Sequence, residues 1–343
     1  MFNFKKFTPM RAAASKAPKT LAAATLAAIA LTGCAPAGDA TPTEVTIATH
    51  DSAVFTKEVI AEFKAQTGIT IKQIKAGDTG AMTNKLVLTK DSPIADAVYG
   101  IDNTFSGVAI ENGIIDGELA AVNFGDVCFN YDKAWFANNE QTAPSSIKDL
   151  TKPAFKGLTV LSNPTTSSPG LAFLATTVEV FGESGWEQYW TALKANDLKI
   201  AAGWEDAYFT EFSGSSGKGD YPIVLSYSSS PAFEVRDSGE YAGESQTASI
   251  LDGCFRQTEY VGVLKNAKNP AAAKKLADFM LTEAFQKTLA DNMYVYPILA
   301  TVELPKAWAD FAPAAKKPVG ATLDIAKNRK TWLDKWSEIF AVN

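Results

Sequence analysis

The sequence predicts an α/β protein with two domains. Segments typical of buried strands alternate with segments typical of helices over most of the chain. The 343 residues, 46% of them hydrophobic and 20% charged, are enough for two domains with cores of their own. Polar or glycine-rich turns follow several strands, and ligands settle at such turns in open α/β sheets. These three observations favour α/β domains with a cleft at the strand ends.

The individual elements follow from hydrophobic periodicity. EVTIAT (44–49) predicts a buried strand, and Phe55, Val59 and Phe63 recur every four residues on a helix that ends at Gly68. A further helix is expected near residues 81–89. Five more strands are predicted at ITIKQI (69–74), ADAVYGI (95–101), LTVLS (158–162), LKIAAG (198–203) and YPIVLSY (221–227).

The C-terminal segment 323–340 carries Trp332, Trp336 and Phe340 at intervals of four residues. Such a stripe is more often core packing than a binding surface, so we expect it to be buried.

Residues 1–33 predict a secretory signal. Basic residues precede an apolar run of 11 residues, LAAATLAAIAL (21–31), which is too short to span a membrane as a helix. The run ends in LTGC, which resembles a bacterial lipobox, so we expect lipidation of Cys34 and a tether over 34–43. An ordinary signal with a chance cysteine is the alternative. The expected location is the outer face of the cytoplasmic membrane, with the lipid as the only membrane contact.

Charge argues against a nucleic-acid partner. Removing residues 1–33 leaves 27 basic and 38 acidic residues, a net charge of −11. No lysine- and arginine-rich run is present, so binding to nucleic acid is not expected.

Two cysteines remain after Cys34, namely Cys128 and Cys254. In an exported protein such a pair suggests a disulfide, and two buried free thiols are the alternative. No CxxC spacing indicates a metal site, and no cofactor is expected.

Polar turns gather at the ends of strands or the starts of helices. Ser167 or Ser168 can cap a helix in which Pro169 occupies the first turn. Each turn alone is more often structural, but several together favour a cleft. The five turns are THDSAVF (49–55), AGDTGAM (76–82), GIDNTF (100–105), SNPTTSSPG (162–170) and SYSSSPAF (226–233).

Aromatic and acidic side chains accompany these turns. The aromatic residues are Tyr99, Trp204, Tyr208, Tyr227, Tyr294 and Tyr296, and the nearby acids are Asp78, Asp96 and Asp102. Flat faces beside carboxylates suit a flat, cationic ligand, provided that two domains enclose it and exclude water.

Catalysis has little support in the sequence. His50 is the only histidine, and neither GxSxG nor HExxH is present. A lone histidine is usually structural, but beside Asp51 and Ser52 at a strand end it is expected to line a site. We therefore expect a binding protein rather than an enzyme.

Six stretches carry a family resemblance. They are ADAVYGIDNTF, FNYDKAWF, SNPTTSSPGLAFL, AAGWEDAYF, VLSYSSSPAF and MYVYPI. In this order and spacing the mature chain resembles the thiamine-binding family, whose members are type II solute-binding proteins of ABC importers. The resemblance implies a two-lobed type II periplasmic-binding-protein fold, with a mostly parallel sheet flanked by helices in each lobe and the ligand cleft between the lobes.

The resemblance also implies roles for single residues. Serines of the 162–170 turn would meet the hydroxyethyl or phosphate tail of thiamine or its phosphates, and Tyr227 would offer a face to the pyrimidine. The ligand-facing positions carried over are Asp96, Asp102, Ser167, Ser168, Trp204, Tyr208, Tyr227 and Ser228.

Two positions depart from the family. Tyr-Asp-Ser is frequent where this chain has His50-Asp51-Ser52, and Trp is frequent where it has Tyr294. In the family, the tyrosine and the tryptophan at these two positions would normally contribute aromatic surface to the site. A protonated His50 would repel the thiazolium, so weaker binding at low pH is expected.

The implied division is 44–127 and 256–343 for lobe 1 and 128–255 for lobe 2. The chain would cross between lobes near 122–131 and 253–264, which brings Cys128 and Cys254 together at the hinge.

The expected function is capture of thiamine, or of its phosphates, by a monomer that delivers it to an ABC permease and its ATPase. A polyamine or ferric-ion binder and, less favoured, a secreted enzyme are the alternatives. An adhesive envelope lipoprotein would leave the cleft empty.

Overall fold

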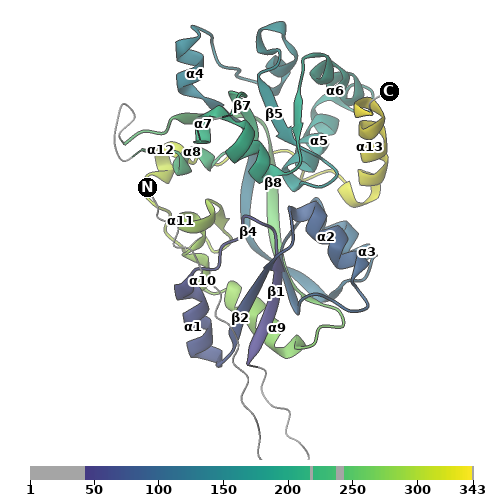
Figure 1. The fold of residues 1–343 in the computed structure, drawn as a ribbon, viewed down its shortest axis with the longest axis vertical. Helices are drawn as coiled ribbons and strands as arrows, with labels where there is room; N and C mark the ends of the chain where they lie inside the picture. Colours follow the sequence, from purple (N-terminus) through teal and green to yellow (C-terminus); the bar gives the residue numbers. More distant parts are fainter. Residues whose placement is uncertain (1–42, 217–218, 237–242, 342–343) are drawn as a thin grey trace, which may run out of the picture. The chain divides into compact units, whose positions relative to one another are not determined.

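The computed structural model describes residues 43–216, 219–236 and 243–341, which belong to one compact unit (Figure 1). The expected signal peptide, the lipidation site Cys34 and nearly all of the tether lie outside the described residues. None of the described helices is long and apolar enough to cross a bilayer.

Within these residues nine strands form one sheet in the order β2-β1-β3-β8-β4-β7-β5-β6, with β9 paired to β4. The strands are β1 (Glu44–Thr49), β2 (Thr70–Lys75), β3 (Ala97–Asp102), β4 (Ile115–Asp132), β5 (Thr159–Ser162), β6 (Lys199–Ala201), β7 (Ile223–Tyr227), β8 (Thr247–Leu264) and β9 (Tyr296–Pro297). The sheet contains two groups of parallel strands, β2-β1-β3 and β7-β5-β6. The antiparallel pair β8 and β4 lies between these two groups.

Helices cover both faces of the sheet. The α-helices are α1 (Lys57–Thr67), α2 (Thr79–Leu88), α3 (Ser106–Glu111), α4 (Lys133–Asn138), α5 (Ser168–Phe181), α6 (Trp186–Ala195), α7 (Ser213–Ser216), α8 (Ser230–Phe233), α9 (Pro270–Met280), α10 (Glu283–Gln286), α11 (Leu289–Met293), α12 (Trp308–Phe311) and α13 (Ile325–Phe340). Two 3₁₀ helices and one π-helix complete them, η1 (Ile147–Thr151), η2 (Pro153–Phe155) and η3 (Asp206–Glu211).

Alternation along the first strand decides which helices pack on which face. Ile47 belongs to a buried cluster with residues of α1 and α9, whereas Ala48 belongs to another with residues of α2 and α3. Successive side chains of a strand point to opposite faces, so one strand supports both layers. Helix α1 ends at Gly68, whose φ of 76° is the left-handed cap geometry that glycine adopts without strain.

The long strands β4 and β8 run through the middle of the unit (Figure 1). Cys128 on β4 and Cys254 on β8 form a disulfide, with their Cα atoms 4.6 Å apart. At the C-terminus, Trp332 and Trp336 of α13 are buried, as their spacing predicts, and Trp336 packs edge-on against Trp190 of α6. Phe340, the third residue of the stripe, is only half-buried and stacks on Trp336.

Candidate functional site

A cavity of about 640 Å³ opens among the turns that follow the strands. This volume suits a small molecule. Four of the five predicted turns contribute lining residues. The GIDNTF turn does not, because it folds against β8, where the Asn103 N–H donates to the Thr258 carbonyl at 3.1 Å.

The cavity brings together most of the residues expected to bind ligand. Twelve candidates follow from the sequence, namely the eight positions carried over from the family together with His50, Asp51, Asp78 and Tyr294. Eight of the twelve line the cavity: His50, Asp51, Asp78, Ser168, Trp204, Tyr208, Tyr227 and Tyr294. Four do not, namely Asp96, Asp102, Ser167 and Ser228.

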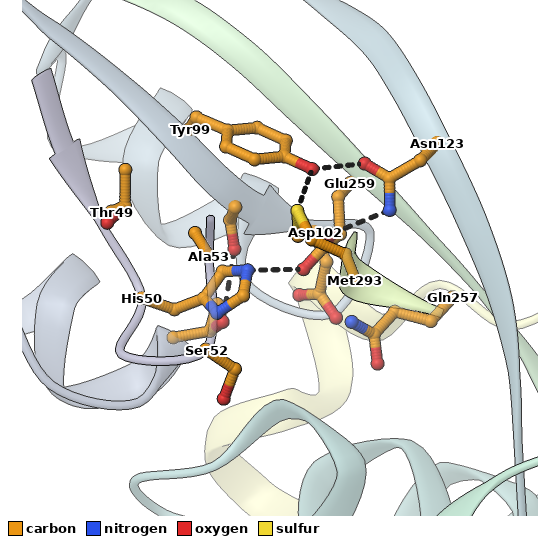
Figure 2. Close-up of polar contacts among 12 residues, drawn as sticks. Thr49, His50, Ser52, Ala53, Tyr99, Asp102, Asn123, Gln257, Glu259 and Met293 are labelled. Atoms are coloured by element: carbon orange, nitrogen blue, oxygen red, sulfur yellow. Dashed lines mark hydrogen bonds and ion pairs between the residues drawn. The ribbon is translucent and has the colours of Figure 1, made fainter. Parts of the chain in front are cut away.

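Glu259 of β8 lines the cavity and was not expected from the sequence. Its Oε1 lies 3.2 Å from His50 Nε2, and its Oε2 accepts a hydrogen bond of 2.7 Å from Asn123 Nδ2. The Tyr99 hydroxyl donates to Asn123 Oδ1 at 2.7 Å and so fixes the amide (Figure 2). A nearly buried carboxylate is thereby held at the cavity wall.

Burial and charge act against each other in this pair. Burial lowers the pKa of His50, but the charge and hydrogen bonding of Glu259, with smaller contributions from Asp78 and Asp51, raise it above 6.5 overall. Burial raises the pKa of Glu259, but His50 and Asn123 lower it below its usual value. The pair therefore favours imidazolium and carboxylate.

Asp78 supplies a second carboxylate and joins two segments of the cavity wall. Its Oδ1 caps α2 by accepting from the Thr79 N–H at 2.7 Å. Its Oδ2 accepts from the Trp204 N–H at 2.9 Å, just before η3. Burial raises its pKa despite these N–H donors, so a ligand cation beside Asp78 would stabilise its ionised form.

Aromatic rings form another wall. Trp204 stacks on Tyr208 with ring centroids 5.2 Å apart and lies 6.0 Å from Tyr227. Two polar contacts hold the rings in place: Trp204 Nε1 donates to Ser226 Oγ at 3.0 Å, and the Tyr208 hydroxyl donates to Glu234 Oε1 at 3.1 Å.

Phe209 and Phe233 extend this wall and were also missed. They are 41% and 45% exposed although both rings are apolar, and their centroids lie 5.9 Å apart. Phe233 in turn meets Tyr294 edge-on at 5.1 Å. Both phenylalanines stand inside the motifs AAGWEDAYF and VLSYSSSPAF, so these motifs were the available signal.

The start of α5 lines the cavity through Thr166, Ser168 and Pro169. Ser167, expected there too, is fully buried and donates its hydroxyl to Ser162 Oγ at 2.8 Å. Ser228 is also fully buried, and its N–H donates to the Asp126 carbonyl at 2.8 Å. Both serines therefore stand behind the lining residues.

The two aspartates placed elsewhere have structural surroundings. Asp96 precedes β3 and lies at the other end of that strand, where its carboxylate accepts from the Thr46 N–H at 2.9 Å and the Asn269 N–H at 2.7 Å. Asp102 is fully buried, and its Oδ1 accepts from Thr104 and from the Phe105 N–H. It lies close to Glu259 without lining the cavity (Figure 2).

Across the residues that the structure describes, no group of three or more histidine, cysteine, aspartate and glutamate side chains is arranged to hold a metal ion. The cavity instead combines five acidic residues, Asp51, Asp78, Glu205, Asp206 and Glu259, with a wall of flat rings. This chemistry suits a planar organic cation.

Gly170 lets α5 approach the turn before it closely enough to reach the cavity. A Cβ atom at this position would lie 2.2 Å from the Ser162 carbonyl oxygen and 2.8 Å from the Pro164 nitrogen, both backbone atoms. Gly170→Ala is therefore expected to destabilise the protein by about 1–3 kcal/mol, the usual cost of overpacking. Denaturant unfolding measures this, and an unchanged midpoint would contradict the close packing.

Comparisons with known proteins identify relatives of this chain. The thiamine-binding periplasmic protein of Salmonella typhimurium is 28% identical over 291 residues, which cover 80% of this chain and 85% of that protein. The thiamine-binding periplasmic protein of Brucella suis is 31% identical over 325 residues, covering 89% and 94%.

A solved structure of a periplasmic thiamin-binding protein has a TM-score of 0.75 at 24% identity and covers 90% of this chain and 100% of that one. The fold is therefore that of the periplasmic binding proteins, as expected. The family model described as bacterial extracellular solute-binding protein matches residues 84–317, about two thirds of the chain. The chain thus belongs to the bacterial extracellular solute-binding protein family.

Proposed function

We propose that this protein captures thiamine in the cavity and delivers it to an ABC permease and its ATPase. The observation that carries the proposal is the pairing of the carboxylates of Asp78 and Glu259 with the ring wall around Trp204. Thiamine is a cation with two flat rings, so the carboxylates would balance the thiazolium and the wall would stack on the pyrimidine.

Enclosure is what makes such contacts sufficient. One stacking or cation–π contact contributes about 0.5–2 kcal/mol, whereas submicromolar binding needs more than about 8 kcal/mol. Several contacts inside one cavity, with water excluded, would reach that sum. The hydroxyethyl end, or a phosphate, would lie toward Thr166 and Ser168 at the start of α5.

The proposed lobes are residues 44–127 with 256–343, and 128–255. The two parallel strand groups on either side of β8 and β4 support this division. Helix α13 would then link the lobes, because its Trp336 packs on Trp190 and its Arg329 lies over the ring of Phe105 at 4.6 Å.

Export and anchoring complete the proposal. Lipidation at Cys34 would hold a monomeric receptor on the outer face of the cytoplasmic membrane. The periplasmic location in the names of the relatives supports export but does not bear on the lipid.

The alternatives fit the cavity less well. A polyamine has no flat ring to match the wall, and among the described side chains a ferric ion would find no cluster of three histidine, cysteine, aspartate or glutamate ligands. A secreted enzyme with a Ser-His or Cys-His mechanism would have to use His50, which pairs with a carboxylate rather than with a nucleophilic hydroxyl or thiol.

Titration of the purified protein with thiamine, its monophosphate and its diphosphate tests the proposal. Calorimetry and tryptophan fluorescence should show saturation at one site, with a Kd below about 1 μM for at least one of the three ligands. A Kd in this range corresponds to a binding free energy of more than about 8 kcal/mol. A folded protein that binds none of the three would refute it.

Trp204→Ala should weaken thiamine binding by about 10–30-fold, because it removes one stacking face of the wall. Trp135→Ala is the matched control, since Trp135 packs on Phe136 of α4 away from the cavity. Calorimetry on both variants gives the comparison, and equal losses of affinity would argue against a role of the wall.

A further inference from the structure

The buried carboxylate of the cavity is in contact with a titratable side chain, His50. His50 and Glu259 both line the cavity, their side chains are 12% and 8% exposed, and Nε2 and Oε1 are 3.2 Å apart. The imidazole has little room to move away. It lies against the backbone of Gly100, where a Cβ atom would come within 2.2 Å of His50 Cδ2.

The other fixed partner of Glu259 brings no charge. Asn123 holds Oε2 as a neutral amide and is itself held by the Tyr99 hydroxyl. In the free protein, the positive charge next to Glu259 is therefore the proton on His50.

Other titratable or charged groups surround the pair. Asp78 at the start of α2 and Asp51 in the turn after β1 act on His50. Asp102 of β3 and Tyr227 of β7 are close enough to Glu259 for each to feel its charge. Lys75 at the end of β2 lines the same cavity. The acids stabilise the protonated imidazole, and its pKa is raised above 6.5.

We propose that a cationic ligand replaces protonated His50 as the counterion of Glu259, so that binding releases the proton of His50 to solvent. The proposal rests on thiamine as the ligand and adds how the site accepts its charge. Two positive charges beside one carboxylate repel each other in an enclosed cavity, and only the imidazole can become neutral by losing a proton.

The sign of the pH dependence follows from this exchange. Above the pKa that His50 has in the free protein, no proton needs to leave and thiamine affinity is constant. Below it, each pH unit should weaken binding by up to about tenfold, until His50 is protonated in the complex as well.

The single histidine makes the proposal directly measurable. NMR of its ring signals in the intact protein gives the pKa of His50 without and with saturating thiamine, and we expect a decrease of at least about one unit on binding. Calorimetry is run in PIPES and in Tris at a pH equal to the pKa of His50 in the free protein. The two binding heats should differ by the heat that the two buffers give on taking up about half a proton per ligand bound.

Two variants assign the proton. In His50→Gln the difference in heat between the two buffers should fall by the half proton that His50 releases, and thiamine affinity should depend less on pH than in the natural protein. Asp102→Asn removes the neighbouring carboxyl, whose pKa is raised to about 7 by burial, and should leave the release intact.

The outcomes separate this inference from the proposed function. Binding with an unchanged or higher His50 pKa, or with a difference in heat between the buffers that is as large in His50→Gln as in the natural protein, overturns the proton exchange and leaves a thiamine receptor. A folded protein that gives no heat and no fluorescence change with thiamine overturns both.

Discussion

Replacing Cys128 and Cys254 together by alanine should lower the free energy of unfolding by about 4–5 kcal/mol, the largest effect we expect of any change. The disulfide joins positions 126 residues apart and fastens β4 to β8, the central pair of the sheet. The loss arises mainly in the unfolded chain, which gains the conformational freedom that so long a closed loop denies it.

Urea unfolding of the oxidised protein, the reduced protein and the double variant measures this effect. The reduced protein should have the same free energy of unfolding as the double variant. The reduced protein keeps both sulfur atoms packed against Ala315, so this comparison separates loss of the bridge from loss of that packing. A difference below about 1 kcal/mol between oxidised and reduced protein would contradict the chain-entropy argument.

Local patterns were sufficient to predict the parallel strands. EVTIAT forms β1 with the predicted bounds, and α1 ends at Gly68 as expected. Both depend on neighbours in sequence, namely the alternation of side chains and the freedom of glycine at positive φ. The turns after such strands share one edge of a sheet, so four of five turns could be placed at the cavity from the sequence.

Residues on the antiparallel strands could not be placed in this way. Glu259 ends a run of four polar residues, Arg256, Gln257, Thr258 and Glu259, and such a run predicts exposure to solvent. Only the pairing of β8 with both β3 and β4 brings its carboxylate to the cavity. That pairing joins segments more than 100 residues apart, as in Asn123 with Glu259.

Asp96 was predicted to bind ligand but lies away from the cavity, whereas Glu259 lines the cavity and was not predicted. Ligands gather after parallel strands, whereas Asp96 precedes β3, so its position at the far end of the strand agrees with the general rule. The family resemblance identified the segment but not the end of the strand at which each aspartate lies.

Asp102→Asn should stabilise the protein at pH 8, although it removes a charged group that the sequence suggested for ligand binding. Burial raises the pKa of Asp102 from 3.8 to about 7, against the hydroxyl and backbone N–H groups of Thr104 and Phe105 that lower it. Its Oδ2 is buried without a hydrogen-bond partner. The folded protein therefore holds a proton on this carboxyl that the unfolded chain releases near pH 4.

The sign follows from that difference. Between about pH 4 and 7 the folded state binds more protons than the unfolded state, so the stability of the natural protein falls as pH rises. A pKa shift of about three units corresponds to a loss of at most about 4 kcal/mol in the free energy of unfolding between pH 4 and pH 8. Asparagine does not ionise, so Asp102→Asn should recover this loss at pH 8 and gain nothing at pH 4. The amide oxygen can still accept from Thr104 and the Phe105 N–H, so the turn before α3 should be kept.

Asp126→Asn is the matched control, because Asp126 is equally buried but accepts from Arg256 Nε and Nη2 at 2.7 and 2.9 Å. Neutralising Asp126 breaks an ion pair and should destabilise the protein at pH 8, opposite to Asp102→Asn. Urea unfolding of the two variants and the natural protein at pH 4, 6 and 8 tests both signs. If Asp102→Asn is the less stable protein at pH 8, the buried carboxylate is held by contacts stronger than its desolvation, and Asp102 is ionised in the fold.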